Sequence, residues 1–358
     1  MASRSSRAAR TTSATSACRR SRGVNKTTYI LYRLVSMAPT LLGVIVLIFF
    51  LSRSIQGDPA RMMAGDAADP QVLEQLRREF QLDRPLPVQL VAYLGNLAQG
   101  NLGISFTTKR PVLESLLERF PATLELTLAS LAFSFLGAVP LGVISAVQRN
   151  RPIDQVVRVI SVGGVSMPVF WSGLMLIWLM YLKLDWLPGA GRLGIYTDPP
   201  PQITGMYTAD SLLSGDWATF KESVLHLLMP AFILGYGYMA TLARLIRSSM
   251  LEVLGQDYVR TARAKGLGER AIVLRHGLRN ALLPVTTMAG LAFAALLGGA
   301  VLTETIFAWP GIGKYVVDAA LYLDYPVIMG FTLLIAIVYM VVNLIVDLLY
   351  SWLNPQIS

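Results

Sequence analysis

The segment "QDYVRTARAKGLGERAIVLRHGLRN", residues 256–280, decides how this chain is interpreted. It is rich in Lys and Arg, yet the segments on either side of it are almost free of charge. Its hydrophobic residues are spaced as in an amphipathic helix, with two glycines near the middle. A basic, helical segment between two hydrophobic ones calls for an explanation in terms of membrane topology or of a partner.

Composition places the chain among membrane proteins. Of its 358 residues, 54% are hydrophobic and 15% are charged, and the mean hydropathy is +0.52. A soluble domain has about 25% charged residues. The net charge of +9 could indicate nucleic acid binding, but the basic residues flank apolar stretches and do not alternate with exposed aromatic residues. We therefore expect no nucleic acid partner.

Residues suited to catalysis or metal binding are scarce. Cys18 is the only cysteine, and His226 and His276 are the only histidines, so no disulfide within the chain and no Cys or His metal site are expected. The sequence has no GxxxxGK[ST] phosphate-binding loop, so this chain is not expected to be an ATPase. An intramembrane serine protease would need a paired Ser and His within the spans, and the sequence offers no such pair.

Six apolar segments are long enough to cross a bilayer, which takes about 20 residues in a helix. Glu125 and His226, each near one end of its segment, are the ionisable residues within them. Met167 and Pro168 are expected to kink the third segment, because helices in lipid tolerate internal prolines. The predicted spans are 34–52, 120–147, 159–182, 224–243, 280–303 and 326–346.

Lys and Arg residues in the connections set the orientation. Eight precede the first span, three lie in the link 148–158 and eight lie in 244–279, and six crossings place all three groups on one side. On the other side, 183–223 and 304–325 carry more acidic than basic residues, and 53–119 carries eight of each. The prediction is an all-α membrane protein of six transmembrane helices with both termini inside the cell.

The loop 53–119 is too long for a structureless connection. Asp69 can cap a helix that has Pro70 at its first position. A second helix is predicted after "DRPLP", so the loop is expected to form a helical outer subdomain. The apolar stripes are Leu73, Leu76 and Phe80 in the first helix and Val88, Leu90, Val91, Leu94 and Leu97 in the second.

Residues 1–26 differ from the rest of the chain. They are rich in Ser, Arg, Ala and Thr without periodicity, and they are predicted to form a disordered basic tail. A true start at Val24 is an alternative that the sequence leaves open. The remainder, 27–358, is predicted to be one transmembrane domain with a cytoplasmic loop at about 248–279.

Within this cytoplasmic loop the pattern predicts two short amphipathic helices. Gly266 and Gly268 separate them, and a glycine hinge permits a positive φ. Such a helix is suited to a groove in a partner protein, whereas a loop that only fixes topology is the simpler alternative. The first stripe is Leu251, Leu254, Tyr258 and Ala262, with Arg260 and Arg263 off it, and the second is Ala271, Leu274 and Leu278.

Several motifs together resemble one family. "YVRTARAKGL" followed by "LRNALLP" is similar to the cytoplasmic coupling loop of ABC importer permeases of the dipeptide, oligopeptide and nickel branch. "ETIFAWPGIGKYVVDAALYLDYPVIMG" (304–330), "LGVISAVQRNRPIDQVVRVISVGGVSMPVFWSGLML" (141–176) and "GDPA" (57–60) resemble the same branch. The resemblance covers 27–358 and is closest to the dipeptide permease subunit with the long first outer loop.

The resemblance implies a type I ABC importer permease fold and a membrane subunit for ATP-driven uptake of di- or oligopeptides. Nickel, haem or another small solute is the alternative cargo. The implied partners are a second homologous permease subunit, two ATP-binding subunits that use ATP and Mg²⁺, an extracytoplasmic peptide-binding protein and membrane lipids. The chain itself would be no enzyme, would bind no cofactor, and would lie in the bacterial plasma (inner) membrane. A channel is a further alternative, but it would leave the large cytoplasmic loop without a role.

The resemblance also implies site residues. Where the general importer pattern has Glu-Ala-Ala, three residues and Gly, this chain has Arg260, Thr261 and Ala262 before Gly266, so no salt bridge of that Glu can be carried over. Small residues in a span more often serve helix packing, and a carboxylate at a span end more often caps the interface. The docking residues implied are Asp257, Tyr258, Arg260, Thr261, Ala262, Arg263, Lys265, Gly266 and Leu267, and the path or gate candidates are Gly290, Ala294, Gly298 and Glu304.

Overall fold

The computed structural model describes residues 26–54, 60–61, 69–79 and 82–353, and this part of the chain is almost wholly helical. Five helices are long and apolar enough to cross a membrane, and a bent pair of helices supplies a sixth crossing if its halves are counted as one span. The predicted all-α membrane fold is confirmed in this sense. Within the described ranges, the only β feature is an isolated bridge between Ile104 and Pro111.

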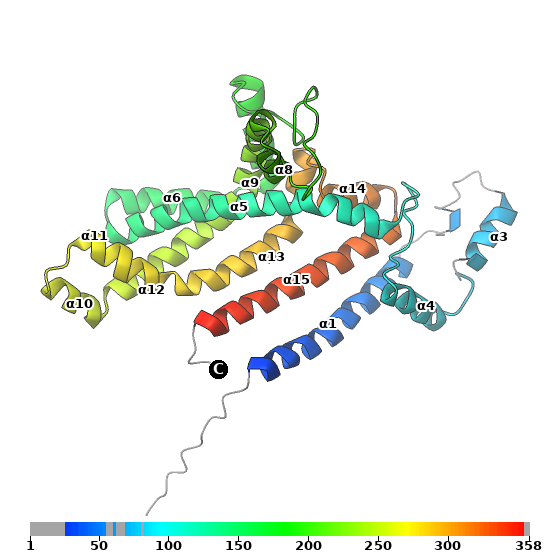
Figure 1. Ribbon diagram of the computed structural model, residues 1–358, viewed down its shortest axis with the longest axis horizontal. Coiled ribbons are helices and arrows are strands. Elements are labelled where there is room, and N and C mark those ends of the chain that lie inside the picture. Colours follow the sequence, from blue (N-terminus) through cyan, green and yellow to red (C-terminus); the bar gives the residue numbers. More distant parts are fainter. Residues whose placement is uncertain (1–25, 55–59, 62–68, 80–81, 354–358) are drawn as a thin grey trace, which may run out of the picture.

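The long helices run beside one another as a bundle (Figure 1). The helices α1 and α15 lie along one edge, α5 and α9 along the other, and α13 between them. These helices are α1 (Lys26–Ser54), α5 (Val112–Val147), α9 (Trp217–Leu254), α13 (Leu283–Ile306) and α15 (Tyr325–Leu353).

The helices α5 and α9 pack against each other more extensively than any other pair of helices in the described part of the chain. Ala138 of α5 and Leu242, Ala243 and Ile246 of α9 belong to one buried cluster. Small residues let helix backbones approach closely in a membrane, where packing and hydrogen bonds replace the hydrophobic effect between helices. The Ser134 hydroxyl, for example, donates a hydrogen bond of 2.8 Å across to the Gly235 carbonyl.

The third predicted span is divided into two helices that meet at a bend of 104°. The first half is α6 (Pro152–Ser166), and the second consists of α7 (Val169–Ile177) and the π-helical turn η1 (Trp178–Lys183). Met167 is extended because the residue before a proline is disfavoured in the helical region. The expected kink is confirmed, and it is close to a right angle.

Short helices cover the two ends of the bundle (Figure 1). One end carries α10 (Asp257–Ala264), α11 (Glu269–Ala271), the π-helical turn η2 (Ile272–Leu278) and α12 (Arg279–Ala281). Helix α1 starts and α15 finishes toward this end, as the predicted topology requires. The outer elements are α3 (Pro70–Glu79), α4 (Leu86–Ala98), α8 (Tyr207–Ser214) and α14 (Ile312–Leu321).

The outer insertion contains the two predicted helices, α3 and α4. The Asp69 carboxylate accepts a hydrogen bond of 2.9 Å from the Gln71 N–H at the start of α3, as predicted. The stripe predicted for the second helix is wrong in part, because Gln89 is buried while Val88 and Val91 are 41% and 69% exposed. Its three leucines are half-buried. The Gln89 amide donates to the carbonyls of Leu82 and Arg84 and so secures the turn before α4.

Two predictions lie outside the described residues. They concern the disordered basic tail, of which residues 1–25 are not described, and the side chains of Leu76 and Phe80 in the first outer stripe.

Candidate functional site

The segment 255–281, called the coupling segment below, lies at the end of the bundle opposite α14. The prediction of one stripe running from Leu251 to Ala262 is wrong. Helix α9 ends at Leu254, Gln256 is extended, and α10 begins afresh at Asp257. The buried residues of α10 are therefore Val259 and Ala262, whereas Tyr258 is 43% exposed.

The end of α10 is a Schellman motif built on Gly266. The Leu267 N–H donates to the Ala262 carbonyl at 3.3 Å, and the Gly266 N–H donates to the Arg263 carbonyl at 2.9 Å. Gly266 has a φ of +78°, which confirms the expected positive φ. Gly268 has a φ of −63° and precedes α11. The reversal of the chain therefore depends on Gly266 and not on its neighbour.

The second predicted stripe is wrong, because the buried residues of η2 are Ile272 and Gly277. Ile272 is fully buried, while Leu274 is 48% exposed. The two buried residues are five positions apart, which is the i→i+5 repeat of a π-helix, whereas the prediction assumed the repeat of an α-helix. Ile272 packs with Val259 and Ala262 in a small cluster, so the two halves of the coupling segment are held against each other.

A polar contact joins the same two halves on their surface. The Asn280 amide donates a hydrogen bond of 2.8 Å to the Tyr258 hydroxyl, which in turn lies 3.4 Å from the His276 carbonyl. Tyr258 thus fastens α10 to the return of the chain toward α13. This contact gives Tyr258 a structural role in addition to its exposed face.

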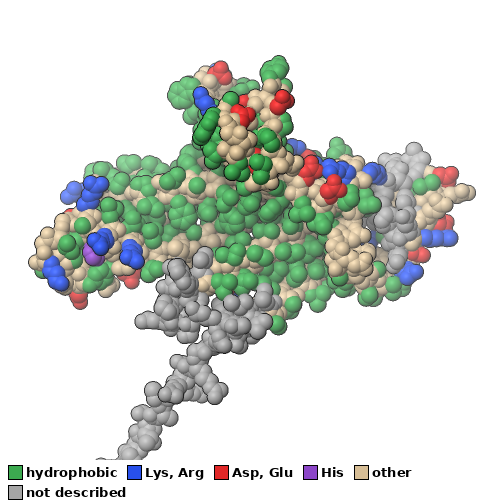
Figure 2. All heavy atoms as spheres, viewed as in Figure 1, with side chains coloured by type: hydrophobic (Ala, Val, Ile, Leu, Met, Phe, Trp, Pro, Cys, Tyr) green, Lys and Arg blue, Asp and Glu red, His purple; other side chains and the backbone are tan. Residues whose placement is uncertain are grey.

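The charges of the coupling segment remain at the surface. Figure 2 shows Lys and Arg side chains gathered at this end of the molecule, with a histidine among them. Arg263 pairs with Glu269 at 2.7 Å, and Arg260 pairs with Asp257 at 3.1 Å. The hydrogen bond from Arg263 holds the pKa of Glu269 below its ordinary value. Thr261, Lys265 and Leu267 are exposed, so the segment offers a firmly folded, mostly basic surface.

A buried carboxylate that the sequence analysis missed lies near this end of the bundle. Asp154, at the start of α6, has no exposed surface. It accepts hydrogen bonds from Arg158 and Arg247 and from the Ser145 hydroxyl. Because these partners lie on α5, α6 and α9, one carboxylate joins three helices. An acid in a link of arginines was the available signal, and the link was interpreted only as a determinant of topology.

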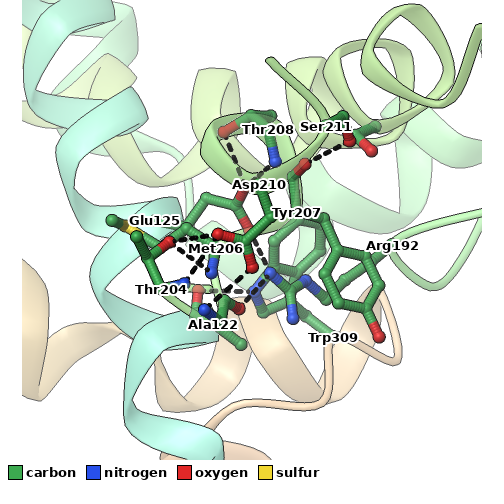
Figure 3. A network of polar contacts seen from close by, with 12 residues as sticks. Ala122, Glu125, Arg192, Thr204, Met206, Tyr207, Thr208, Asp210, Ser211 and Trp309 are labelled. Atoms are coloured by element: carbon green, nitrogen blue, oxygen red, sulfur yellow. Dashed lines mark hydrogen bonds and ion pairs between the residues drawn. The ribbon is translucent and has the colours of Figure 1, made fainter. Parts of the chain in front are cut away.

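Away from the coupling segment, a buried ion pair lies beneath the residues 184–216, called the outer cap (Figure 3). Arg192 donates to Glu125 of α5 at 2.5 Å and to the Gly205 carbonyl at 2.9 Å. Its guanidinium lies 3.5 Å from the centre of the Tyr207 ring. The other Glu125 oxygen accepts two hydrogen bonds of 2.7 Å from Thr208. Arg192 and Glu125 are 8% and 4% exposed, so the pair is shielded from water.

A second buried carboxylate shapes the outer cap itself. Asp210 of α8 accepts hydrogen bonds from the backbone and hydroxyl of Thr204 at 2.7 Å and from the Gly205 N–H at 2.9 Å. Burial alone would raise the pKa of Asp210, but these hydrogen bonds outweigh it and the pKa lies below the ordinary value. The charged form of Asp210 is therefore the one that holds the turn before α8.

Glu304, one of the gate candidates, is fully buried. It accepts hydrogen bonds of 2.6 Å from the Thr123 hydroxyl and 2.9 Å from the Lys314 N–H in the first turn of α14. A side chain at Gly311 would place its Cβ 2.4 Å from the Glu304 carboxylate, which explains the glycine there. Glu304 thus caps α14 and ties it to α5, in agreement with the expectation of a capping carboxylate.

The three small path candidates of α13 differ in their surroundings. A Cβ at Gly290 would lie 1.9 Å from Val346 of α15, so this glycine serves close helix packing. Ala294 is 4% exposed. Gly298 is exposed, and a Cβ there would meet no atom within 4 Å. In the described ranges, no three His, Cys, Asp or Glu residues gather closely enough to hold a metal ion.

Comparison with known proteins covers nearly the whole chain. Residues 138–358 match the family described as "Binding-protein-dependent transport system inner membrane component", and 26–127 match its N-terminal family. The chain is 49% identical to a probable D,D-dipeptide transport system permease protein of Escherichia coli, over 88% of this chain and 93% of that protein. It is 48% identical to a di/tripeptide transport system permease protein of Pseudomonas aeruginosa, over 92% and 98%.

Two further similarities are more distant. A glutathione transport system permease protein of Escherichia coli is 41% identical, over 92% of this chain and 98% of that protein. Among solved structures, an inward-facing MetNI methionine ABC transporter matches with a TM-score of 0.48 at 18% identity, over 67% of this chain and 96% of that chain.

Proposed function

Because this chain belongs to the family of inner membrane components of binding-protein-dependent transport systems, we propose that it carries short peptides into the cell. It is a multi-pass permease subunit and not an enzyme. Peptide cargo is supported by relatives that are 41–49% identical and are described as permeases for D,D-dipeptides, di- and tripeptides, and glutathione. These cargoes share a small size and a peptide backbone.

The observation that carries the mechanism is the coupling segment. It is a compact basic projection whose fold is fixed internally, by the Gly266 turn and by the cluster of Val259, Ala262 and Ile272. A short helix with a buried inner face and an exposed outer face is suited to a groove on a partner. In this proposal α10 and the turn after it dock on an ATP-binding subunit, and closure of that subunit moves α9 and α13 through the coupling segment.

The assembly is the second part of the proposal. Two ATP-binding subunits bind ATP and Mg²⁺, a second homologous permease subunit completes the path, and an extracytoplasmic protein delivers the peptide. The exposed Gly298 on α13 is a candidate for the face turned toward the path. Gly290 and Glu304 are better explained by helix packing and by capping.

Uptake of radiolabelled Ala-Ala into membrane vesicles tests the proposal. Vesicles with all subunits, the binding protein and ATP should accumulate peptide, and omission of the ATP-binding subunits should abolish uptake. Uptake that continues without those subunits would indicate a channel. Uptake of nickel or haem in place of peptide would assign a different cargo to the same machinery.

A further inference from the structure

A pocket of about 310 Å³ opens on the outer side of the molecule, apart from the coupling segment. It lies where the loop before α5 meets α14. Such a volume is at the lower end of the range for small-molecule sites. Its polar lining includes Thr107, Arg119, Lys314, Tyr315, Asp318 and Asp324.

Two buried polar atoms of this lining have no hydrogen-bond partner in the described part of the chain. They are the Tyr315 hydroxyl and Asp324 Oδ1, in residues that are 7% and 1% exposed. The other oxygen of Asp324 is fully engaged, since it accepts from the Ser105 hydroxyl at 2.6 Å and the Thr107 N–H at 2.9 Å. A buried polar atom without a partner is costly, and a ligand that supplies the partner would recover that cost.

The backbone around the pocket is also strained. Among the described residues, five non-glycine residues have a positive φ, and three of them lie in or beside this lining. They are Lys109, next to Thr108, then Ala308 in the wall, and Leu323, next to Asp324, with φ values of 57°, 47° and 54°. Strain of this kind is concentrated at ligand sites, where surrounding structure maintains it.

The lining carries charges of both signs. Arg119 lies 4.5 Å over the centre of the Tyr315 ring, donates to the Ser115 carbonyl and has the Glu118 carboxylate 4.0 Å away. A guanidinium has five N–H donors, so others remain for an anion. Lys314 is paired with Asp318 at 2.7 Å. Asp324, by contrast, has no ion-pair partner in the described chain and is a buried carboxylate suited to an ammonium group.

From these contacts we infer that the outer pocket binds the two charged ends of a short peptide, which rests on the proposed peptide cargo. The peptide ammonium lies at Asp324, and the peptide carboxylate lies at Arg119 and the Tyr315 hydroxyl. A simple anion would leave Asp324 unpaired, and a simple cation would leave Arg119 unused. A zwitterion satisfies both, and the neighbouring Pro310, Ala319 and Tyr322 offer an apolar wall for its side chains.

The test measures peptide binding to the assembled complex in detergent without the binding protein, by titration calorimetry. The probes are Ala-Ala, N-acetyl-Ala-Ala and Ala-Ala-amide. Capping either end should raise the Kd about tenfold, as expected for the loss of a charged hydrogen bond. Asp324→Asn should raise the Kd of Ala-Ala about tenfold and leave that of N-acetyl-Ala-Ala unchanged.

Tyr315→Phe keeps the ring beneath Arg119 and should raise the Kd of Ala-Ala about threefold. Its matched control is Tyr325→Phe, which removes another buried hydroxyl without a partner, outside this pocket, and should change nothing. If the Asp324→Asn complex does not assemble, Tyr315→Phe and the capped peptides still test whether the pocket binds the ends of the peptide. Equal binding of free and capped peptides, or no binding, overturns the pocket.

Vesicle uptake separates this inference from the proposed function. A complex that accumulates Ala-Ala through its binding protein, but does not distinguish free from capped peptide at this pocket, refutes the pocket alone. A complex that neither accumulates nor binds any of the three peptides refutes the peptide cargo as well.

Discussion

The outer cap and the coupling segment, two separate regions of the molecule (Figure 1), use charged residues in contrasting ways. The outer cap buries its Arg192–Glu125 pair beneath α8, where Arg192 also donates to the Gly205 carbonyl and Glu125 also accepts from Thr208. The coupling segment buries apolar residues in its cluster and leaves its ion pairs exposed. Buried charges hold an element to its own chain, whereas exposed charges on a rigid fold remain available to another protein.

The outer cap should be the more sensitive of the two to loss of a single charge. Arg192→Met leaves Glu125 buried without its cation, and removal of one partner of a buried pair costs about 3–5 kcal/mol. We expect a clearly lower unfolding temperature of the detergent-solubilised protein and faster proteolysis within residues 193–204.

The control for this prediction is Arg110→Met. Arg110 also pairs with carboxylates, Glu114 and Glu118, but on the exposed start of α5. Its loss should change the unfolding temperature little. If Arg192→Met and Arg110→Met change the unfolding temperature equally, burial of the Arg192–Glu125 pair does not add to stability. The proposed difference between the buried and the exposed ion pairs is then wrong.

The second prediction concerns backbone geometry in the coupling segment. A Cβ at Gly266 would meet no atom within 4 Å, so the effect of a substitution comes from the φ of +78° alone. A left-handed conformation costs about 1–2 kcal/mol for a residue with a Cβ, and a β-branched residue tolerates it least. Gly266→Val should therefore insert and assemble, while ATP-driven uptake falls about tenfold and ATP hydrolysis without substrate persists.

Gly268→Ala is the matched control. Gly268 has an ordinary φ and open space around it, so alanine should leave uptake unchanged. Normal uptake by Gly266→Val at equal expression would mean that the turn has no role in coupling. Equal loss in both variants would point to general disturbance of the loop.

The sequence predicted the spans better than the faces of the short helices. Stretches without charge identify membrane helices because a charge in lipid is costly wherever it lies in the span. Which face of a short helix is buried depends on the residue at which the helix begins. The extended residue Gln256 separates α10 from α9, and the hydrophobic periodicity of the sequence does not indicate this break. In the π-helical turn that follows, Ile272 belongs to the buried cluster and Leu274 is exposed, although both are aliphatic.

The buried ion pairs could not be predicted from the sequence for a different reason. Glu125 was recognised as a carboxylate at a span end, but its partner Arg192 is 67 positions away. Asp154 meets Arg247 across 93 positions. Such pairings follow from the packing of the outer cap on α5 and of α6 on α9, and a single sequence does not specify which acid meets which base. Gly266 is the exception, because a Schellman turn is local and its glycine is visible in the sequence.

The smallest expected effect is that of the exposed pair between Arg263 and Glu269. Arg263→Ala should lower coupled uptake less than about threefold, because exposed ion pairs contribute little and are screened by salt. The pKa of Glu269 is lowered by Arg263, so the pair is intact above the ordinary Glu pKa and is lost as the pH falls through the lowered value. Uptake at neutral pH should thus not depend on this titration.

Glu269→Gln, which leaves Arg263 in place, should match Arg263→Ala if the pair acts only within the chain. A much larger loss with Arg263→Ala than with Glu269→Gln would contradict this and place the Arg263 guanidinium in direct contact with the ATP-binding subunit.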